Sequence, residues 1–121
     1  MAYTDFTQLS VWRLGFATLV AVYELADDFP KQERYILTQD LLRSANSVIH
    51  NVAEGYGRYE KRDKTRFYKI SRGSAYEAIS QLLVAKVRKY ASTEDIRATI
   101  DAYKEVITQL DRLIITLEGK R

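Results

Sequence analysis

The chain has 121 residues, of which 46% are hydrophobic and 29% charged, and its formal net charge is +3. This length suits one domain, and the composition is that of a globular protein rather than a disordered chain. The sequence contains no cysteine, which excludes disulfides, thiol nucleophiles and thiolate metal sites. It contains a single histidine, His50, so few side chains suited to acid–base or metal chemistry are present.

Neither a secretion signal nor a membrane span is visible in the sequence. The first residues, MAYTDFTQLSVW, lack a basic start followed by an apolar run. No segment approaches the roughly 18 uninterrupted apolar residues that a membrane-spanning helix needs. We therefore expect a cytoplasmic protein with a single domain over residues 1–121.

Apolar residues at helical spacing predict a first helix from about Asp5 or Thr7 to Asp28. Phe29 and Pro30 should end it, because proline disfavours helical geometry in the residue before it. The expected core face consists of Leu9, Trp12, Phe16, Leu19, Val20 and Tyr23.

The second predicted helix spans roughly Lys31 to Tyr56. Gly55 and Gly57 flank its end, where a residue in the left-handed conformation often closes the last turn. The residues expected to be buried are Leu37, Leu41, Ala45, Val48, Ile49 and Val52.

A third helix is predicted from about Lys61 to Tyr90, and Ser92 supplies a plausible cap for a fourth. Short connections place successive helices antiparallel, so the expected fold class is all-α, an up-down four-helix bundle. The fourth helix has a clear apolar seam with steps of four and three: Ile96, Ile100, Tyr103, Ile107, Leu110, Ile114 and Leu117.

Several apolar residues widen these faces beyond what one bundle would bury. They are Val106, Leu113 and Ile115 on the fourth helix and Leu82 and Leu83 on the third. Widened apolar faces often mark subunit contacts, so we expect a homo-oligomer. The alternative is a scatter of ordinary surface hydrophobic residues.

Charge is distributed unevenly along the chain. Residues 1–57 have a net charge of −3, residues 58–90 a net charge of +7 and residues 91–121 a net charge of −1. Between Arg58 and Arg72 there are seven basic and two acidic residues. On a helical wheel, five of the cations fall within an arc of about 140°, and Arg58 joins them if the helix begins early. The predicted basic stripe is Arg58, Lys61, Arg62, Arg66, Lys69 and Arg72.

A continuous outward stripe of this kind is typical of a surface that binds the phosphates of RNA or DNA, because each contact releases a condensed counterion. Tyr59 and Tyr68 lie close by in sequence. Assembly of several copies would strengthen binding through avidity. The alternative is a charged face that only keeps the helix solvated. The opposite side of the helix is expected to carry Phe67, Ile70, Ser74 and Ala78.

No constellation for catalysis is apparent. His50 and Glu54 lie one turn apart, which is only half of a metal site, and no second pair accompanies them. The serines Ser47, Ser71 and Ser74 have no visible orienting base and acid. We therefore expect no enzyme activity, no metal and no cofactor.

Gly73 lies inside the third predicted helix, where glycine costs roughly 1 kcal/mol relative to alanine. Close approach of a neighbouring helix is the expected reason, with a ligand contact as the alternative.

Two runs, NVAEGYGR at residues 51–58 and FYKISRGS at residues 67–74, point to a known family. Together with Val11-Trp12 and the FPKQERY segment at residues 29–35, they resemble the four-helix-bundle proteins encoded by intervening sequences of bacterial 23S rRNA genes. The resemblance covers nearly the whole chain. By matching position, the family pattern is carried by Asn51, Glu54, Gly55, Arg58, Arg72, Gly73 and Ser74.

This resemblance implies a cytosolic bundle that assembles as a ring-shaped homopentamer. The architecture is also similar to that of accessory proteins of diversity-generating retroelements, which are basic pentamers that bind nucleic acid and a reverse transcriptase. We expect Asn51 and Glu54 to make polar contacts across helices or subunits, and a buried Glu54 to pair with Arg43 or Arg72.

The function that these features favour is that of a non-catalytic, homo-oligomeric protein that binds RNA or DNA phosphates through the basic stripe. A protein-interaction scaffold and an accessory protein of a reverse transcriptase are the alternatives.

Overall fold

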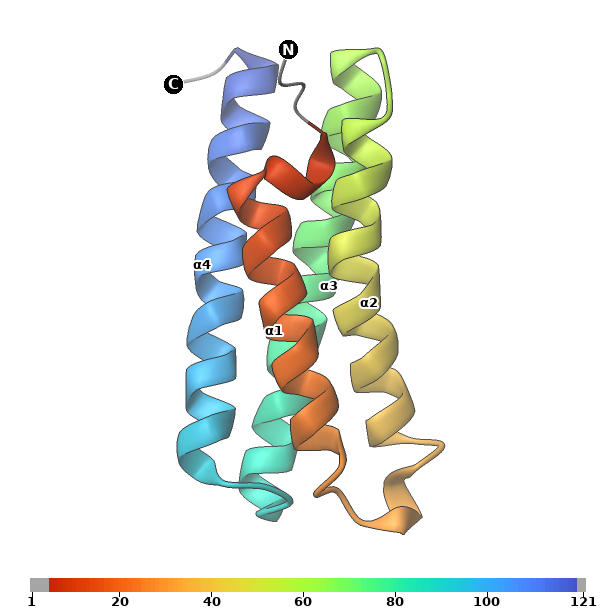
Figure 1. The fold of residues 1–121 in the computed structure, drawn as a ribbon, viewed down its shortest axis with the longest axis vertical. Coiled ribbons are helices and arrows are strands. Elements are labelled where there is room, and N and C mark those ends of the chain that lie inside the picture. Colours follow the sequence, from red (N-terminus) through yellow and green to blue (C-terminus); the bar gives the residue numbers. More distant parts are fainter. Residues whose placement is uncertain (1–4, 120–121) are drawn as a thin grey trace.

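The computed structural model describes residues 5–119 and consists of four long α-helices and two short 3₁₀-helices (Figure 1). No strand occurs within that range, so the predicted all-α class is confirmed. In chain order the elements are η1 (Phe6–Gln8), α1 (Ser10–Ala26), η2 (Lys31–Glu33), α2 (Leu37–Tyr56), α3 (Lys61–Arg88) and α4 (Thr93–Glu118).

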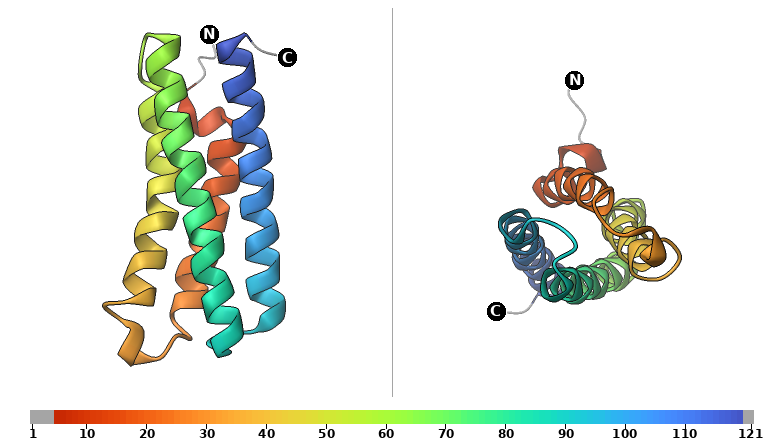
Figure 2. Two further views of the ribbon diagram at one scale, coloured as in Figure 1. Left: turned by 180° about the vertical axis from the view of Figure 1, so that it is seen from behind. Right: turned by 90° about the horizontal axis from the view of Figure 1, so that it is seen from below.

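The four long helices stand side by side and successive helices run in opposite directions (Figure 1). Helix α1 contacts α2 and α4, and α3 contacts the same two helices. Helices α1 and α3 share no such contact and occupy opposite corners of the bundle, as the end view in Figure 2 shows. The predicted antiparallel up-down bundle is therefore confirmed. Among residues 5–119, no helix is both long enough and apolar enough to cross a membrane.

Helix α1 differs most from its prediction. It begins at Ser10, because Asp5 caps the separate turn η1 by accepting a hydrogen bond from the Thr7 amide at 2.9 Å. The predicted core face was partly wrong, since Phe16, Val20 and Tyr23 are 46%, 45% and 48% exposed. The buried residues are Val11, Gly15, Thr18, Leu19, Val22 and Leu25.

Close packing against α2 explains why α1 buries a different side from the one predicted. A β-carbon placed on Gly15 would lie only 2.9 Å from Cγ2 of Ile49. Gly15 therefore faces α2 and lets the two helices approach closely. The remaining apolar side chains of α1 are too evenly distributed around it for periodicity alone to identify the buried side.

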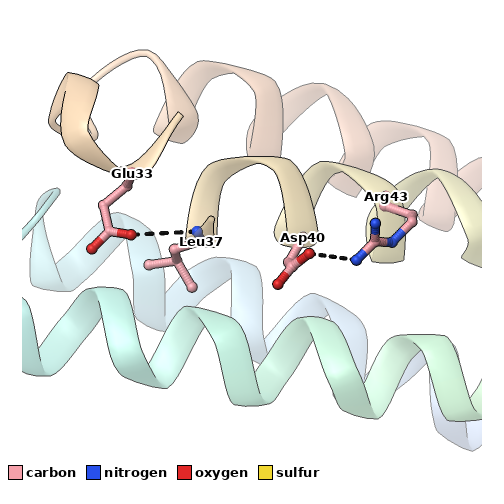
Figure 3. Close-up of polar contacts among 4 residues, drawn as sticks. All are labelled: Glu33, Leu37, Asp40 and Arg43. Carbon is pink, nitrogen blue, oxygen red and sulfur yellow. Dashed lines mark hydrogen bonds and ion pairs between the residues drawn. The ribbon is translucent and has the colours of Figure 1, made fainter. Parts of the chain in front are cut away.

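Helix α2 begins at Leu37 rather than at Lys31. The residues before it form η2, and a carboxylate oxygen of Glu33 accepts a hydrogen bond from the Leu37 amide at 3.3 Å (Figure 3). The other carboxylate oxygen accepts from the Tyr90 hydroxyl at 2.7 Å, which ties this loop to the end of α3. All six residues predicted to be buried in α2 are buried.

The end of α2 is closed without a left-handed residue, which corrects the sequence interpretation. Gly57 has a φ of −77°, within the right-handed region. Instead, Lys64 donates a hydrogen bond to the Tyr56 carbonyl at 2.7 Å. Gly55 is required for a different reason, because a β-carbon there would lie 2.7 Å from the Tyr68 ring. This glycine brings the first turns of α3 close to α2.

Helix α3 ends at Arg88, two residues before the predicted end, because Lys89 adopts a left-handed conformation with a φ of +60°. The predicted cap of α4 is confirmed, since Ser92 accepts a hydrogen bond from the Asp95 amide at 3.2 Å. The seam of α4 is buried from Ile96 to Ile114, and Leu117 is partly buried.

Two of the residues assigned to widened faces belong to the core of the single chain. Val106 and Leu82 are fully buried, so they do not require a subunit contact, and Leu113 is partly buried. Leu83 and Ile115 remain 46% and 44% exposed. The apolar surface left for a partner is therefore smaller on α4 than predicted.

Candidate nucleic-acid interface

The predicted basic stripe divides into two groups once the bundle is assembled. Three of its cations pair with carboxylates: Lys69 with Glu118 at 2.7 Å, Arg72 with Asp111 at 2.6 Å and Arg58 with Glu54 at 2.6 Å. The other three, Lys61, Arg62 and Arg66, are exposed and form no ion pair with any residue in the range 5–119.

Helix α4 supplies the carboxylates of two of these three pairs. It runs antiparallel beside α3 and brings Glu118 and Asp111 to cations that lie 49 and 39 residues away in sequence. The prediction of a continuous positive stripe was therefore wrong. Of the six cations of the predicted stripe, the three without an ion pair among residues 5–119 lie in the first two turns of α3, and we refer to Lys61, Arg62 and Arg66 as the basic tip.

An aromatic ring orders part of this region. The guanidinium carbons of Arg66 and Arg58 lie 4.3 and 4.7 Å from the centre of the Phe67 ring, a geometry that favours cation–π attraction. The helical wheel predicts Phe67 and Ile70 on the side of α3 opposite the cations. In the structure, Phe67 is half-buried beneath two of these cations and Ile70 is 42% exposed, so both placements were wrong. Ser74 and Ala78 are buried as predicted.

The basic tip borders an open groove of about 1150 Å³ between the start of α3 and the end of α4. Lys69 extends the positive side, but Glu60, Asp63 and Glu118 also line the groove and reduce its potential. Tyr59, in the turn before α3, is 96% exposed. This arrangement offers two or three phosphate contacts beside one aromatic ring on which a base can stack.

Tyr68, the other tyrosine near the stripe in sequence, is not part of this surface. It is buried against Gly55, and burial raises the pKa of its hydroxyl. Its role is to pack α3 on α2.

The family-motif residues Asn51 and Ser74 belong to a polar contact between α2 and α3. The Asn51 amide donates to the carbonyl and to the hydroxyl of Ser47, both at 2.9 Å. The Ser47 hydroxyl in turn lies 2.7 Å from that of Ser74. Asn51 therefore acts within its own helix, and the contact across helices is made by the two serines. Nearby, the buried Ser71 donates to the Val48 carbonyl at 2.7 Å, a role that sequence spacing did not reveal.

Glu54 differs from its prediction. It is exposed, and its partner is Arg58 one turn later in sequence. The expected partners are engaged elsewhere, Arg43 with Asp40 (Figure 3) and Arg72 with Asp111.

Gly73 also departs from expectation. A β-carbon on this residue would meet no atom within 4 Å, so no helix of the same chain approaches it. The close approach predicted from its position is absent from the part of the chain that the structure describes.

Groups suited to other chemistry lie away from the groove. His50 is exposed on α2, and residues 5–119 contain no cluster of three or more His, Cys, Asp or Glu side chains that could hold a metal ion. Within the same residues, the buried Tyr103 hydroxyl and the Gln81 side-chain oxygen have no hydrogen-bond partner. Burial raises the pKa of Tyr103.

Comparison with known proteins supports the same fold and names a family. A crystal structure of a protein of unknown function from the S23 ribosomal protein family of Bacteroides thetaiotaomicron is similar, with a TM-score of 0.80 and 19% identity. The match covers 86% of this chain and 97% of the other. No protein with a curated description matches the chain. The family model described as "23S rRNA-intervening sequence protein" matches residues 7–112, and the chain therefore belongs to this family.

Proposed function

We propose that this protein is a non-catalytic, cytoplasmic nucleic-acid-associated protein that self-associates and binds the phosphates of structured RNA through the basic tip. The observation that supports the proposal best is the presence of Lys61, Arg62 and Arg66 as exposed cations without carboxylate partners among residues 5–119. The family pattern and its implied pentamer supply the expectation that several tips act together.

The number of free cations sets the strength of such binding. Three phosphate contacts correspond to a slope of log affinity against log salt of about −2 to −3 for each engaged copy. One tip alone therefore binds weakly at physiological salt. Assembly of several copies places several tips on one RNA and raises the overall affinity through effective concentration.

Fluorescence anisotropy with a labelled RNA hairpin at 50–200 mM salt tests the proposal. The variant Lys61→Glu/Arg62→Glu/Arg66→Glu should lose binding. Its matched control is Arg34→Glu/Lys104→Glu/Arg97→Glu, which makes the same change in net charge at three exposed cations outside the groove. Equal losses in both variants, or no binding by the unchanged protein at low salt, would reject a specific role for the tip.

A protein-interaction scaffold is the second candidate, and one observation favours it. Tyr35 and Ile36 in the loop before α2 are 77% and 63% exposed, although both are large and apolar. A protein partner, such as a reverse transcriptase, would cover this pair. Capture of a defined partner that persists after ribonuclease treatment, and is lost in Tyr35→Ser/Ile36→Ser, would support this candidate instead.

A further inference from the structure

Tyr59 stands clear of the rest of the bundle. It lies in the turn between α2 and α3, and 96% of its surface is exposed. Within residues 5–119 its ring stacks on no other aromatic ring. A tyrosine in this position adds little to the packing of the fold and keeps a large apolar ring in water. Because Tyr59 directly precedes Glu60 and Lys61, which both line the groove, its ring lies at the edge of the groove.

The groove has apolar as well as charged side chains along it. Ile70 from α3 and Leu117 from α4 both line it, and these two helices lie side by side (Figure 2). Their neighbours in sequence, Lys69 and Glu118, form the 2.7 Å ion pair that joins the helices. This ion pair holds the two apolar side chains at about the same height along the bundle. A site that bound only phosphates would gain nothing from such an apolar surface.

The three cations of the basic tip can follow the backbone of one strand. Lys61 and Arg66 are five residues apart, which places them about 7.5 Å from each other along the axis of α3. This separation is comparable with that of successive phosphates in an extended strand. Arg62 lies between them in sequence, and all three side chains line the groove.

Two carboxylates in the groove oppose phosphates elsewhere in it. Glu60 and Asp63 line the groove and form no ion pair with any residue in the range 5–119. A carboxylate repels a phosphate, whereas an uncharged base can donate an N–H hydrogen to it. The groove therefore suits a strand whose phosphates contact the basic tip while its bases turn toward the groove.

A duplex cannot use these features together. Its bases are paired and stacked on one another, and the major groove of an RNA helix is too narrow and deep for side chains to read. The bases of an unpaired segment can instead turn outward and stack on aromatic side chains. An exposed tyrosine beside free cations thus favours unpaired nucleotides over a helix.

We propose that the groove selects unpaired nucleotides of RNA. The basic tip contacts the phosphates of a single-stranded segment, Tyr59 stacks on one of its bases, and Ile70 and Leu117 contact another. On a hairpin, the site takes the loop rather than the stem. This inference rests on the proposed function and names the part of an RNA that the same site binds.

Three fluorescent probes separate the contribution of the bases from that of the phosphates. They are a single-stranded RNA of about 12 nucleotides, the blunt duplex of the same sequence, and a strand of equal length whose sugars have no bases. In anisotropy titrations at 50 mM salt, the single strand should bind at least about tenfold more tightly than the abasic strand, because stacking of even one base contributes about this factor. It should also bind more tightly than the duplex, although the duplex has the higher charge density.

Two results with these probes would overturn the proposal. Equal affinities for the single strand and the abasic strand would show that the bases make no contact. Equal or tighter binding of the duplex would show that phosphates alone decide what the groove binds.

Tyr59→Ala assigns the base contact to one side chain. The affinity for the single strand should fall about tenfold, whereas the affinity for the abasic strand should change less than twofold. The salt dependence should stay the same, because no phosphate contact is removed. Tyr59→Phe keeps the ring and should bind like the unchanged protein. The control Tyr35→Ala removes a tyrosine that is 77% exposed in the loop before α2 and should have no effect.

The Tyr59 variants also have results that contradict stacking. An unchanged affinity of Tyr59→Ala for the single strand, or an equal loss for the single and the abasic strand, would exclude a base contact at this ring. A loss in Tyr59→Phe as large as that in Tyr59→Ala would assign the effect to the hydroxyl group. Circular dichroism should show both variants folded, since the side chain is almost fully exposed.

A second pair of variants tests the apolar side of the groove. Ile70→Thr should weaken binding of the single strand about threefold, because part of an apolar surface is replaced by a hydroxyl group. Its control is Ile115→Thr, which changes a residue of α4 outside the groove with a similar exposure, 44% against 42%. The control should bind normally, and equal losses in the two variants would contradict a contact at Ile70.

Failure of this inference and failure of the proposed function give different results. If the basic tip binds RNA without any base contact, Lys61→Glu/Arg62→Glu/Arg66→Glu should lose all three probes while Tyr59→Ala loses none. If the proposed function is wrong, no probe binds the unchanged protein, or the tip variant and its charge-matched control lose binding equally. Loss of every probe in the tip variant, together with loss of only the single strand in Tyr59→Ala, supports both proposals.

Discussion

The first two turns of α3 and its middle turns contain the same kinds of cation but differ in what faces them. In the middle, Lys69 and Arg72 lie beside α4 and pair with its carboxylates. At the start, Lys61, Arg62 and Arg66 have no carboxylate partner in residues 5–119. The comparison shows that a cation on a bundle helix is available to a ligand only where the neighbouring helix places no carboxylate side chain beside it.

The largest expected effect separates these two regions directly. Reversing the three charges of the basic tip should reduce affinity for an RNA hairpin about 100-fold at 50 mM salt, because three phosphate contacts become repulsive. The free energy of unfolding should change little, since these side chains are exposed. Anisotropy and urea denaturation on the same variant measure the two quantities. A large loss of stability would mean that the tip cations stabilise the fold, and the start of α3 would then not differ from its middle in the way described.

The second prediction concerns how the start of α3 is held. Gly55→Ala should lower the free energy of unfolding by about 1–3 kcal/mol, because the new β-carbon would lie 2.7 Å from the Tyr68 ring. The control Gly57→Ala should cost far less, since the nearest atom to its β-carbon would be a carbonyl oxygen at 3.6 Å. Similar costs in urea denaturation would show that Gly55 is not required for this close packing.

The third prediction concerns α4, which supplies the partners of the middle region. Burial raises the pKa of Tyr103 above its unfolded value, because the charged form is disfavoured in the core, so ionisation of this hydroxyl opposes folding. The free energy of unfolding is therefore unaffected by this group below about pH 10 and falls as pH rises further, with a slope of up to about 1.4 kcal/mol per pH unit. Tyr103→Phe should remove this slope.

At neutral pH, Tyr103→Phe should leave the free energy of unfolding unchanged or slightly higher, because the buried hydroxyl has no hydrogen-bond partner in residues 5–119. Urea denaturation at pH 7 and pH 11 checks both statements. A marked loss at pH 7 would reveal a partner for the hydroxyl.

The smallest expected effect is that of the paired cations. Lys69→Gln and Arg72→Gln should each lower the free energy of unfolding by about 0.2–1 kcal/mol, since both ion pairs are substantially exposed to solvent. RNA affinity should fall less than threefold in either variant. If either variant weakened RNA binding as much as the tip variant does, the continuous stripe predicted from the sequence would be supported instead.

The sequence predicted the parts of the fold that repeat regularly. The α4 seam is buried because its apolar residues recur in steps of four and three with polar residues between them. Helix α1 is apolar on several sides, so its buried side is decided by the contact of Gly15 with α2, which no local pattern encodes.

The candidate site was only half predictable for a related reason. Its cations are adjacent in sequence and were easily found. The acids that neutralise Lys69 and Arg72 are 49 and 39 residues away and become neighbours only when α4 folds back along α3. A helical wheel of one helix contains no information about such partners.

Salt dependence of RNA binding measures the number of free cations most directly. Anisotropy titrations between 50 and 200 mM salt should give a slope of log affinity against log salt of about −2 to −3 for each engaged copy. The slope should fall close to zero when Lys61, Arg62 and Arg66 are reversed, and should remain when Lys69 and Arg72 are neutralised. A slope that follows Lys69 and Arg72 instead, or that is unchanged without the tip, would contradict the account.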